Sequence, residues 1–256
     1  MSVGWWFRDT LEMVRRNLLH IRRTPELLLD VTVQPVMFVV LFRFVFGGAI
    51  QIAGDSYVNY LMAGIFVQTV AFAGVYTGVL LANDLKNGMI DRFRSLPMSQ
   101  ASVLTGRTTT DLLRAMLAVA VMWGIGSLVG FNPQGGVGGA LAAIGIMLAF
   151  GFALSWLGVA MGAWVRTPEA LQGLIFTTVF PLTFASSAFV PTDTMPDWLR
   201  VFAENQPMTR VINAVRDLIL GGNGGPDLVP ALIWSLGALF IFFPLAVWLY
   251  RRRISQ

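Results

Sequence analysis

The chain has 256 residues, of which 55% are hydrophobic and only 12% are charged, and its mean hydropathy is +0.67. Because soluble domains usually carry about 25% charged residues, this composition argues against a soluble protein and predicts an all-α integral membrane protein. The absence of cysteine excludes disulfides, thiolate zinc sites and a thiol nucleophile, and the net charge of +4 suggests basic cytoplasmic loops and not nucleic-acid binding.

The N-terminal segment, residues 1–24, is predicted to form an amphipathic helix. Apolar positions such as Phe7 and Leu11 share one face of the helical wheel, and basic positions such as Arg15 and Arg16 share the other. This pattern is typical of a helix that lies in the membrane plane, with a helix packed on a soluble partner as the alternative. Charges interrupt the first turns, so we expect an uncleaved segment and not a cleaved signal peptide.

Six apolar segments reach, or nearly reach, the roughly 20 residues that a spanning helix needs. They are residues 27–48, 57–82, 105–130, 137–165, 169–190 and 228–250. Lys and Arg occur in the N-terminal segment, in the second-to-third and fourth-to-fifth connections and in the C-terminal tail, whereas connections 49–56 and 131–136 contain none. The charges therefore predict a multi-pass protein of the plasma membrane with both termini in the cytoplasm.

The connection 191–227 is then extracellular and is predicted to contain two short helices. Thr194 is a candidate N-cap for the first of them, and Gly221 is a stop signal at the end of the second. Two placements stay open at this stage, because the helices can dip into the outer leaflet or form a surface cap with no part in transport.

Paired small residues mark both ends of the fourth apolar segment. Gly135 and Gly139 are four positions apart, and so are Gly158 and Gly162. This spacing lets two helices approach closely in a membrane. We expect contacts within the chain, with a contact between two copies as the alternative.

The residues needed for chemistry are missing. Lys86 is the only lysine and follows Leu85, so the chain has no P-loop, and His20 is the only histidine. No metal-ligand cluster and no nucleophile elbow occur in the sequence. We therefore predict no catalytic residue, no metal and no cofactor in this chain, which is not expected to be an enzyme.

Charges inside the apolar segments are few. Asp30, Asp84 and Asp111 lie near the ends of spans, and Arg43 is the exception. Arg43 either reaches back to the outer headgroups or faces a polar pathway. The candidates for a substrate pathway are Arg43, Phe66, Tyr76, Phe176 and Phe180. Phe72 and Phe184 are further aromatic residues on the spans that suit an apolar cargo, although such residues more often serve in packing or lipid contact.

The densest group of charges is the stretch 84–100, DLKNGMIDRFRSLPMSQ. A short lateral helix in this stretch would combine apolar contacts from Ile90 and Phe93 with charges from Arg92 and Arg94. Such a helix is suited to docking in a groove of a partner protein. A simple positive-inside signal is the alternative.

Several of these stretches together resemble a known family. The segments RNLLHIRRTPELLLDVTVQPVMFVVLFRFVFGGAI, NGMIDRFRSLPMS, GRTTTDLLRA and FVPTDTMPDWLRVFAENQPMTRVINAVRDLILGG are similar to the membrane subunits of ABC-2-type ATP-binding-cassette exporters, near the daunorubicin-resistance branch. Arg43 departs from the family, in which a neutral residue is more usual. The resemblance covers nearly the whole chain and implies one transmembrane domain, residues 1–256.

The resemblance implies a separate ATPase subunit, which binds ATP and magnesium, and a second permease chain that is identical or related. It further implies that the stretch 84–100 is the coupling helix and that the N-terminal helix adds to its contact. The residues expected at the ATPase interface are Lys86, Asn87, Gly88, Ile90, Asp91, Arg92, Phe93, Arg94, Ser95, Leu96 and Pro97, with Arg15 and Arg16. The first, second and fifth spans would line the route.

The function expected from this resemblance is export of a hydrophobic or amphiphilic small molecule, such as a drug or antibiotic. An exporter of a lipid or polysaccharide with the same architecture is the alternative. An ion-coupled carrier and a non-transporting membrane anchor are the alternatives from other classes.

Overall fold

The computed structural model describes residues 33, 35–48, 56–87, 100–165 and 167–254. Every regular element within these residues is a helix. In chain order they are the apolar helix Pro35–Phe46, whose second half is the π-helix η1 (Leu41–Phe46), α3 (Tyr57–Lys86), α5 (Gln100–Leu128), α6 (Gly136–Trp164), α7 (Pro168–Phe184), the 3₁₀ turn η2 (Thr192–Thr194), α8 (Asp197–Asn205), α9 (Pro207–Ile219) and α10 (Leu228–Ile254).

Four of the described helices are long and apolar enough to cross a membrane: α3, α5, α6 and α10. Their bounds agree with the second, third, fourth and sixth predicted segments to within a few residues. In the first predicted segment the structure describes a helix only from Pro35, and residues 27–32 and 34 lie outside the described residues.

The fifth predicted segment, 169–190, is shorter than expected as a helix. The Thr167 side chain caps its N-terminus by accepting a hydrogen bond from the Ala170 N–H at 3.3 Å, and α7 ends at Phe184. The Gln206 side-chain amide donates to the carbonyl oxygens of Leu182 and Ala185. These bonds satisfy carbonyls that the end of a helix leaves free, so the chain turns away before residue 190.

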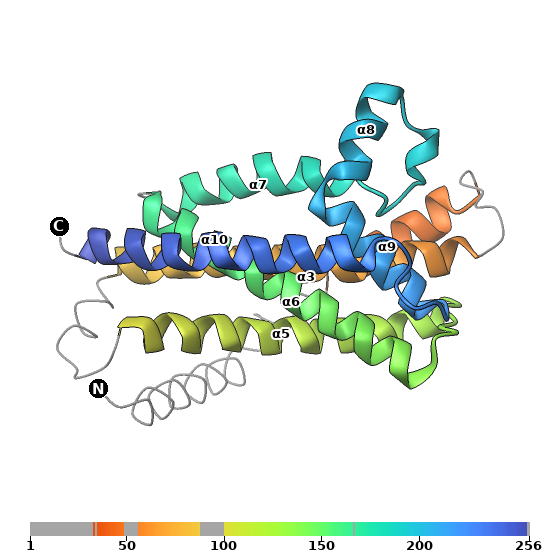
Figure 1. Ribbon diagram of the computed structural model, residues 1–256, viewed down its shortest axis with the longest axis horizontal. Coiled ribbons are helices and arrows are strands. Elements are labelled where there is room, and N and C mark those ends of the chain that lie inside the picture. The colour runs from red at the N-terminus through yellow and green to blue at the C-terminus, as the bar shows by residue number, and fades with distance from the viewer. Residues whose placement is uncertain (1–32, 34, 49–55, 88–99, 166, 255–256) are drawn as a thin grey trace.

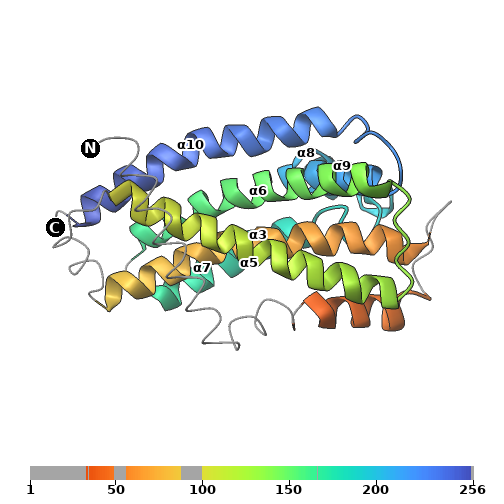
Figure 2. The same ribbon diagram turned by 90° about the horizontal axis from the view of Figure 1, so that it is seen from below.

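The long helices run side by side and share two ends (Figures 1 and 2). The tail end holds the C-terminal parts of α3, α6 and α10 and the starts of α5 and α7. The cap end holds α8, α9 and the 129–135 connection. The helices therefore alternate in direction as the predicted topology requires.

A seam of glycines joins α3 to α6 at the centre of the bundle. A Cβ atom added to Gly78 would overlap the carbonyl oxygen of Gly158, and one added to Gly162 would overlap that of Gly78. At the cap end, a Cβ atom on Gly135 or Gly139 would overlap the carbonyl oxygen of Leu218 on α9. The paired glycines of the sequence are thus used for contacts within the chain, as small residues are in membrane helices generally.

The connection between α7 and α10 contains two short helices, α8 and α9, as predicted. The predicted cap at Thr194 is wrong, because Thr194 closes the 3₁₀ turn η2 and α8 begins at Asp197 after Pro196. The hydroxyl of Thr194 donates to the Pro191 carbonyl instead of capping a helix. Soon after α9, Gly221 has φ +98°, the left-handed conformation that favours glycine at a helix stop.

Candidate functional site

The tail end contains the described part of the predicted partner interface. Lys86, the last residue of α3, pairs with Glu169 at the start of α7, and its Nζ lies 3.1 Å from Oε1. Both side chains are more than half exposed, at 56% and 71%. The Asn87 N–H closes α3 by donating to the Asn83 carbonyl at 3.0 Å. The other predicted interface residues, Gly88 to Pro97 with Arg15 and Arg16, lie outside the described residues.

The C-terminal arginines belong to the same end. The Arg253 guanidinium donates to the carbonyl oxygens of Ala163 and Val165, at the C-terminus of α6. A cation at this position satisfies free carbonyls and opposes the negative end of the helix dipole. Arg251 and Arg252 are exposed beside it. The tail end is therefore a basic surface, fixed to the bundle by Arg253.

An aromatic array runs along α7 and crosses to the helix 35–46. It consists of Phe38, Phe42, Phe46, Phe176, Phe180, Phe184 and Phe189. Ring centroids lie 4.6 Å apart for Phe176 and Phe180 and 4.3 Å apart for Phe180 and Phe184. Phe189, which is buried, joins the two helices through Phe184 at 4.9 Å and Phe42 at 4.3 Å. Offset stacking at such distances is favourable for aromatic rings.

The structure brings together only part of the predicted pathway. Phe176 and Phe180 are neighbours in the array, and Phe176 is 61% exposed. Phe66 is fully buried and stacks on Trp123 with centroids 5.4 Å apart, so it belongs to the α3–α5 core and not to the array. Tyr76 is exposed on α3, next to Val75, which packs in the cluster that joins α3 to α7.

Arg43 lies in the π-helix η1, half-buried at the cap end, with its guanidinium 5.9 Å from the Phe44 ring centroid. Single turns of π-helix are rare within α-helices, but the ones that occur are often found at functional sites. Arg43 thus lies on the same short helix as Phe38, Phe42 and Phe46 of the array.

Sequence reasoning missed four members of the array: Phe38, Phe42, Phe46 and Phe189. The first three are four residues apart, and so are Phe176, Phe180 and Phe184. Residues at this spacing share one face of a helix, so the signal was present in the sequence. Phe189 lies in the turn after α7, and only the folded structure shows that it joins the two rows.

A charged pair lies inside the bundle on α5. Asp111 and Arg114 are 3.8 Å apart, and their side chains are only 11% and 10% exposed. The candidate membrane span on this helix is Thr108–Leu128, so Asp111 lies near the end of a span, as the sequence predicts. Charges inside a membrane span are costly and usually face the bundle interior.

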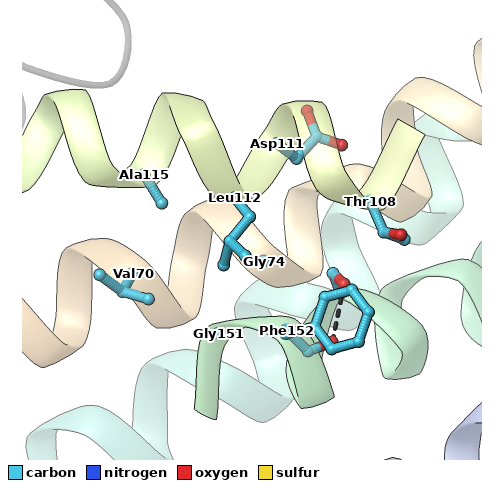
Figure 3. Close-up of a pocket in the computed structure, with 9 residues that line it drawn as sticks. Val70, Gly74, Thr108, Asp111, Leu112, Ala115, Gly151 and Phe152 are labelled. Atoms are coloured by element: carbon cyan, nitrogen blue, oxygen red, sulfur yellow. Dashed lines mark hydrogen bonds between the residues drawn. The ribbon is translucent and has the colours of Figure 1, made fainter. Parts of the chain in front are cut away.

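The space next to Asp111 is too small for a cargo molecule (Figure 3). Thr108 and Leu112 of α5 face Phe152 of α6 across it, and Val70 of α3 closes one side. Its volume is about 10 Å³, room for one water molecule at most. This part of the bundle is a packed core and not a passage.

At the cap end, Arg216 of α9 joins three parts of the chain. Its guanidinium lies 3.5 Å from the ring centroid of Tyr60 on α3 and donates to the Tyr60 carbonyl at 3.2 Å. It also donates to the Ser187 carbonyl at 2.6 Å and to Asn213 Oδ1 at 2.9 Å. Burial lowers the pKa of Arg216 to about 10, so the group stays protonated at neutral pH. Arg216 holds α9 against the end of α3.

A second ionic contact connects α9 to the start of α10. Arg210 pairs with Asp227, which also accepts a hydrogen bond from the Asn213 side chain at 2.9 Å. Asn213 therefore joins the two arginine contacts into one network. The cap is held by these polar contacts and also by the buried apolar face of α9, which packs in the same core as α3.

Comparison with known proteins identifies the family. Residues 8–220 match the ABC-2 type transporter family, which is most of the chain. This chain belongs to the ABC-2 type transporter family. It is 34% identical over 244 residues, 95% of this chain and 86% of the other, to a daunorubicin resistance ABC transporter permease protein of Streptomyces coeruleorubidus.

Two further relatives are more distant. A probable doxorubicin resistance ABC transporter permease protein of Mycobacterium tuberculosis is 24% identical over 246 residues, covering 95% of this chain and 88% of that protein. A putative transport permease of Porphyra purpurea is 26% identical over 208 residues, 80% of this chain and 71% of that protein. The predicted resemblance is confirmed. An ABC-2 permease is a transport subunit and not an enzyme, and its ATPase is a separate subunit.

Proposed function

We propose that this chain is the permease of an ABC exporter that moves a hydrophobic or amphiphilic small molecule, of the anthracycline kind, out of the cell. The observation that carries the proposal is the 34% identity, over 95% of the chain, to a permease named for daunorubicin resistance. The helical bundle with four candidate spans supports it, because a permease must cross the membrane. The separate ATPase subunit supplies ATP and magnesium chemistry to the transporter.

The proposed membrane arrangement has six crossings. Four are α3, α5, α6 and α10, and the other two are α7 and the segment that ends in the helix 35–46. With 17 residues, α7 is about 25 Å long, close to the thickness of the hydrocarbon core. The tail end faces the cytoplasm, since Lys86 and the C-terminal arginines gather there. Both termini are then cytoplasmic, in the plasma membrane.

In this arrangement α8 lies at the outer membrane surface. Trp198, Val201 and Phe202 follow a helical spacing and are 76%, 62% and 49% exposed. Arg200, on the neighbouring face, lies 3.5 Å from Asp197 and 3.9 Å from Glu204. An apolar ridge beside a charged row is typical of a helix that lies in the headgroup layer.

The transport route follows the aromatic array. The exposed rings of Phe44, Phe46 and Phe176 lie on the helix 35–46 and on α7, and these two helices flank α3 on one side of the bundle (Figure 2). We expect a second permease chain, identical or related, to cover this side, with the array lining the route between the two chains. Arg43 and Tyr76 lie beside this route in the proposal, and Phe66 does not.

The ATPase contact lies at the tail end. The connection between α3 and α5 starts beside Lys86 and returns at Gln100, so both of its ends are at the basic surface. We propose that its charged centre, with Arg92 and Arg94, docks into the ATPase and that Arg15 and Arg16 add to the contact. Closure of the ATPase would then move α3 and α5 as levers between two packings of the bundle.

The experiment reverses these charges with Arg92→Glu/Arg94→Glu. The full chain is expressed with its ATPase, and membrane level, co-purified ATPase and daunorubicin efflux are measured together. We expect a normal membrane level with loss of ATPase binding and of efflux, because the reversed charges face a partner site built for cations. The matched control is Arg251→Glu/Arg252→Glu, the same charge change at the same end but outside the connection.

Other outcomes would contradict the proposal in distinguishable ways. Unchanged ATPase binding in the double variant contradicts the docking role of the connection. Efflux that persists after ATP depletion while the proton gradient stays intact indicates an ion-coupled carrier. A wild-type complex that moves no daunorubicin, together with envelope defects on deletion, indicates an exporter of lipid or polysaccharide.

A further inference from the structure

An apolar groove lies between α5 and α6 on their cap-end halves. The two helices separate toward the cap end, and α3 lies between them (Figure 2). The groove has a volume of about 400 Å³. Its lining consists of Met116, Val119, Ala120 and Trp123 from α5 and Ala140, Ile144, Met147 and Leu148 from α6. Every lining residue is apolar.

The side chains at the bottom of the groove are held in place by packing against other rings. Trp123 is backed by Phe66 of α3, whose ring lies parallel to it with an interplanar angle of 8°. Phe131, in the connection between α5 and α6, packs edge-on against both rings at 5.2 and 5.7 Å. Val119 and Met147 are buried, at 5% and 1% exposure. The recess is therefore set by packed aromatic rings and does not depend on one adaptable side chain.

The depth of the groove matches one membrane leaflet. On α5 the lining residues start 5 residues from Leu128 and reach 12 residues from it, and on α6 they start 4 residues from Gly136 and reach 12. At 1.5 Å per residue these positions lie roughly 6 to 18 Å below the helix ends. Half of a hydrocarbon core is about 15 Å thick, so the groove occupies the acyl region of the leaflet at the cap end.

The rim shows what surrounds the groove. Leu117 and Val121 on α5 and Leu141 on α6 are 47%, 38% and 64% exposed. All three lie on candidate membrane spans, so in a membrane these exposed side chains would face lipid tails. No charged residue occurs between Ser127 and Gly136, the stretch above the groove. From this stretch, a headgroup meets only neutral side chains and backbone.

We propose that this groove holds one acyl chain of a membrane phospholipid from the leaflet at the cap end. A recess of this size in a span does not stay empty, because its lining would lose packing contacts on one side. An amphiphilic drug needs a few placed polar groups to orient it, and the indole nitrogen of Trp123 is the only polar side-chain atom among the lining residues. An acyl chain needs only apolar contact on several sides, and the groove supplies it.

The test uses a phospholipid with a photoreactive diazirine in its acyl chain. The probe is added to membranes of cells that make the full chain, the protein is solubilised and washed in detergent, and only then illuminated. Crosslinked peptides are located by mass spectrometry. We expect crosslinks in the Met116–Trp123 and Ala140–Leu148 peptides to survive the wash, while crosslinks on the exposed face of α10, around Ile233 and Phe240, are lost.

A matched pair of variants tests the groove itself. Ala120→Phe places a ring in the groove, whereas Ala142→Phe makes the same change on an exposed position of α6 that does not line it. We expect Ala120→Phe to lower the retained crosslink by roughly tenfold, since closely fitting apolar pockets respond strongly to added volume. Ala142→Phe should leave the crosslink unchanged.

Three results would overturn the proposal. Equal retention of label on α10 and in the groove means ordinary surrounding lipid. An unchanged crosslink in Ala120→Phe places the chain elsewhere. Displacement of the probe by excess daunorubicin makes the groove a cargo site. The wild-type comparison between groove and α10 stands even if a variant fails to fold, and the first two results do not depend on whether the chain exports a drug.

Discussion

The spans α3 and α10 are similar in hydropathy, but α3 lies at the centre of the bundle and α10 lies at its periphery. Their most apolar stretches have mean hydropathies of 1.8 and 2.2, yet 78% of the α3 stretch is buried and only 11% of the α10 stretch. Gly64, Gly74 and Gly78 let other backbones approach α3, whereas Gly237 of α10 has no atom close enough to restrict a side chain. Hydropathy shows that a helix enters the membrane, and small residues show which helix is at the centre.

The largest expected effect comes from a methyl group in the glycine seam. Gly78→Ala places a Cβ atom on the carbonyl oxygen of Gly158, which is backbone and has no rotamer to change. We expect a loss of stability of about 3 kcal/mol or more, at the upper end of the usual cost of overpacking, because the overlapped atom belongs to the backbone. Thermal unfolding of the purified chain in detergent, followed by loss of its monodisperse peak, measures this effect.

The matched control is the same substitution on the peripheral span. Gly237→Ala meets no neighbouring atom and removes a flexible residue from a helix interior, so we expect no loss, or a gain of up to about 1 kcal/mol. Equal losses in Gly78→Ala and Gly237→Ala would contradict the central position of α3. A loss of stability in Gly237→Ala but not in Gly78→Ala would mean that α10, and not α3, is the closely packed span.

A smaller effect is expected where α3 meets the cap. Arg216→Ala removes the cation over Tyr60 and the bonds to the carbonyl oxygens of Tyr60 and Ser187. Hydrogen bonds to charged groups contribute about 1.5–3 kcal/mol, and we expect a loss of that order in the same unfolding assay. Arg200→Ala is the control, because its pairs with Asp197 and Glu204 are exposed and contribute about 0–1 kcal/mol. Equal effects of the two variants would mean that Arg216 does not anchor the cap.

The sequence predicted where the long spans lie better than it predicted where α7 ends and α8 begins. Apolar length alone located α3, α5, α6 and α10, because a membrane helix must satisfy its backbone internally whatever it packs against. The ends of α7 and α8 were harder to predict, since Gln206 closes α7 from 24 residues away and Thr194 bonds within a 3₁₀ turn. Local capping rules do not include such distant donors.

The sequence correctly suggested aromatic residues for the candidate site, but it identified only some of the residues that the structure brings together. Phe176 and Phe180 were found because aromatic residues on a span are conspicuous, and Phe66 was chosen on the same ground although it points into the core. Composition does not distinguish these cases, since the direction of a side chain depends on which helix lies beside it. Helical spacing would have separated them, because Phe176 belongs to a row of three rings and Phe66 does not.

The smallest effect on folding is expected where exposed rings are removed from the two peripheral helices α7 and α10. Phe176 on α7 and Phe240 on α10 are 61% and 78% exposed, so replacing either with Ala should change stability by no more than about 0.5 kcal/mol. Their consequences for transport should differ. Phe176 stacks on Phe180 within the proposed route, whereas Phe240 is an exposed ring outside the aromatic array.

Phe176→Ala is therefore expected to lower daunorubicin efflux by roughly fivefold, the equivalent of ~1 kcal/mol of lost aromatic contact with a planar cargo. Phe240→Ala should leave efflux unchanged, and both variants should keep their ATPase complex. Efflux is measured in cells at matched membrane levels. If the two variants transport equally well, the exposed ring on α7 contributes no more to transport than the exposed ring on α10. The route must then lie on another face of the bundle.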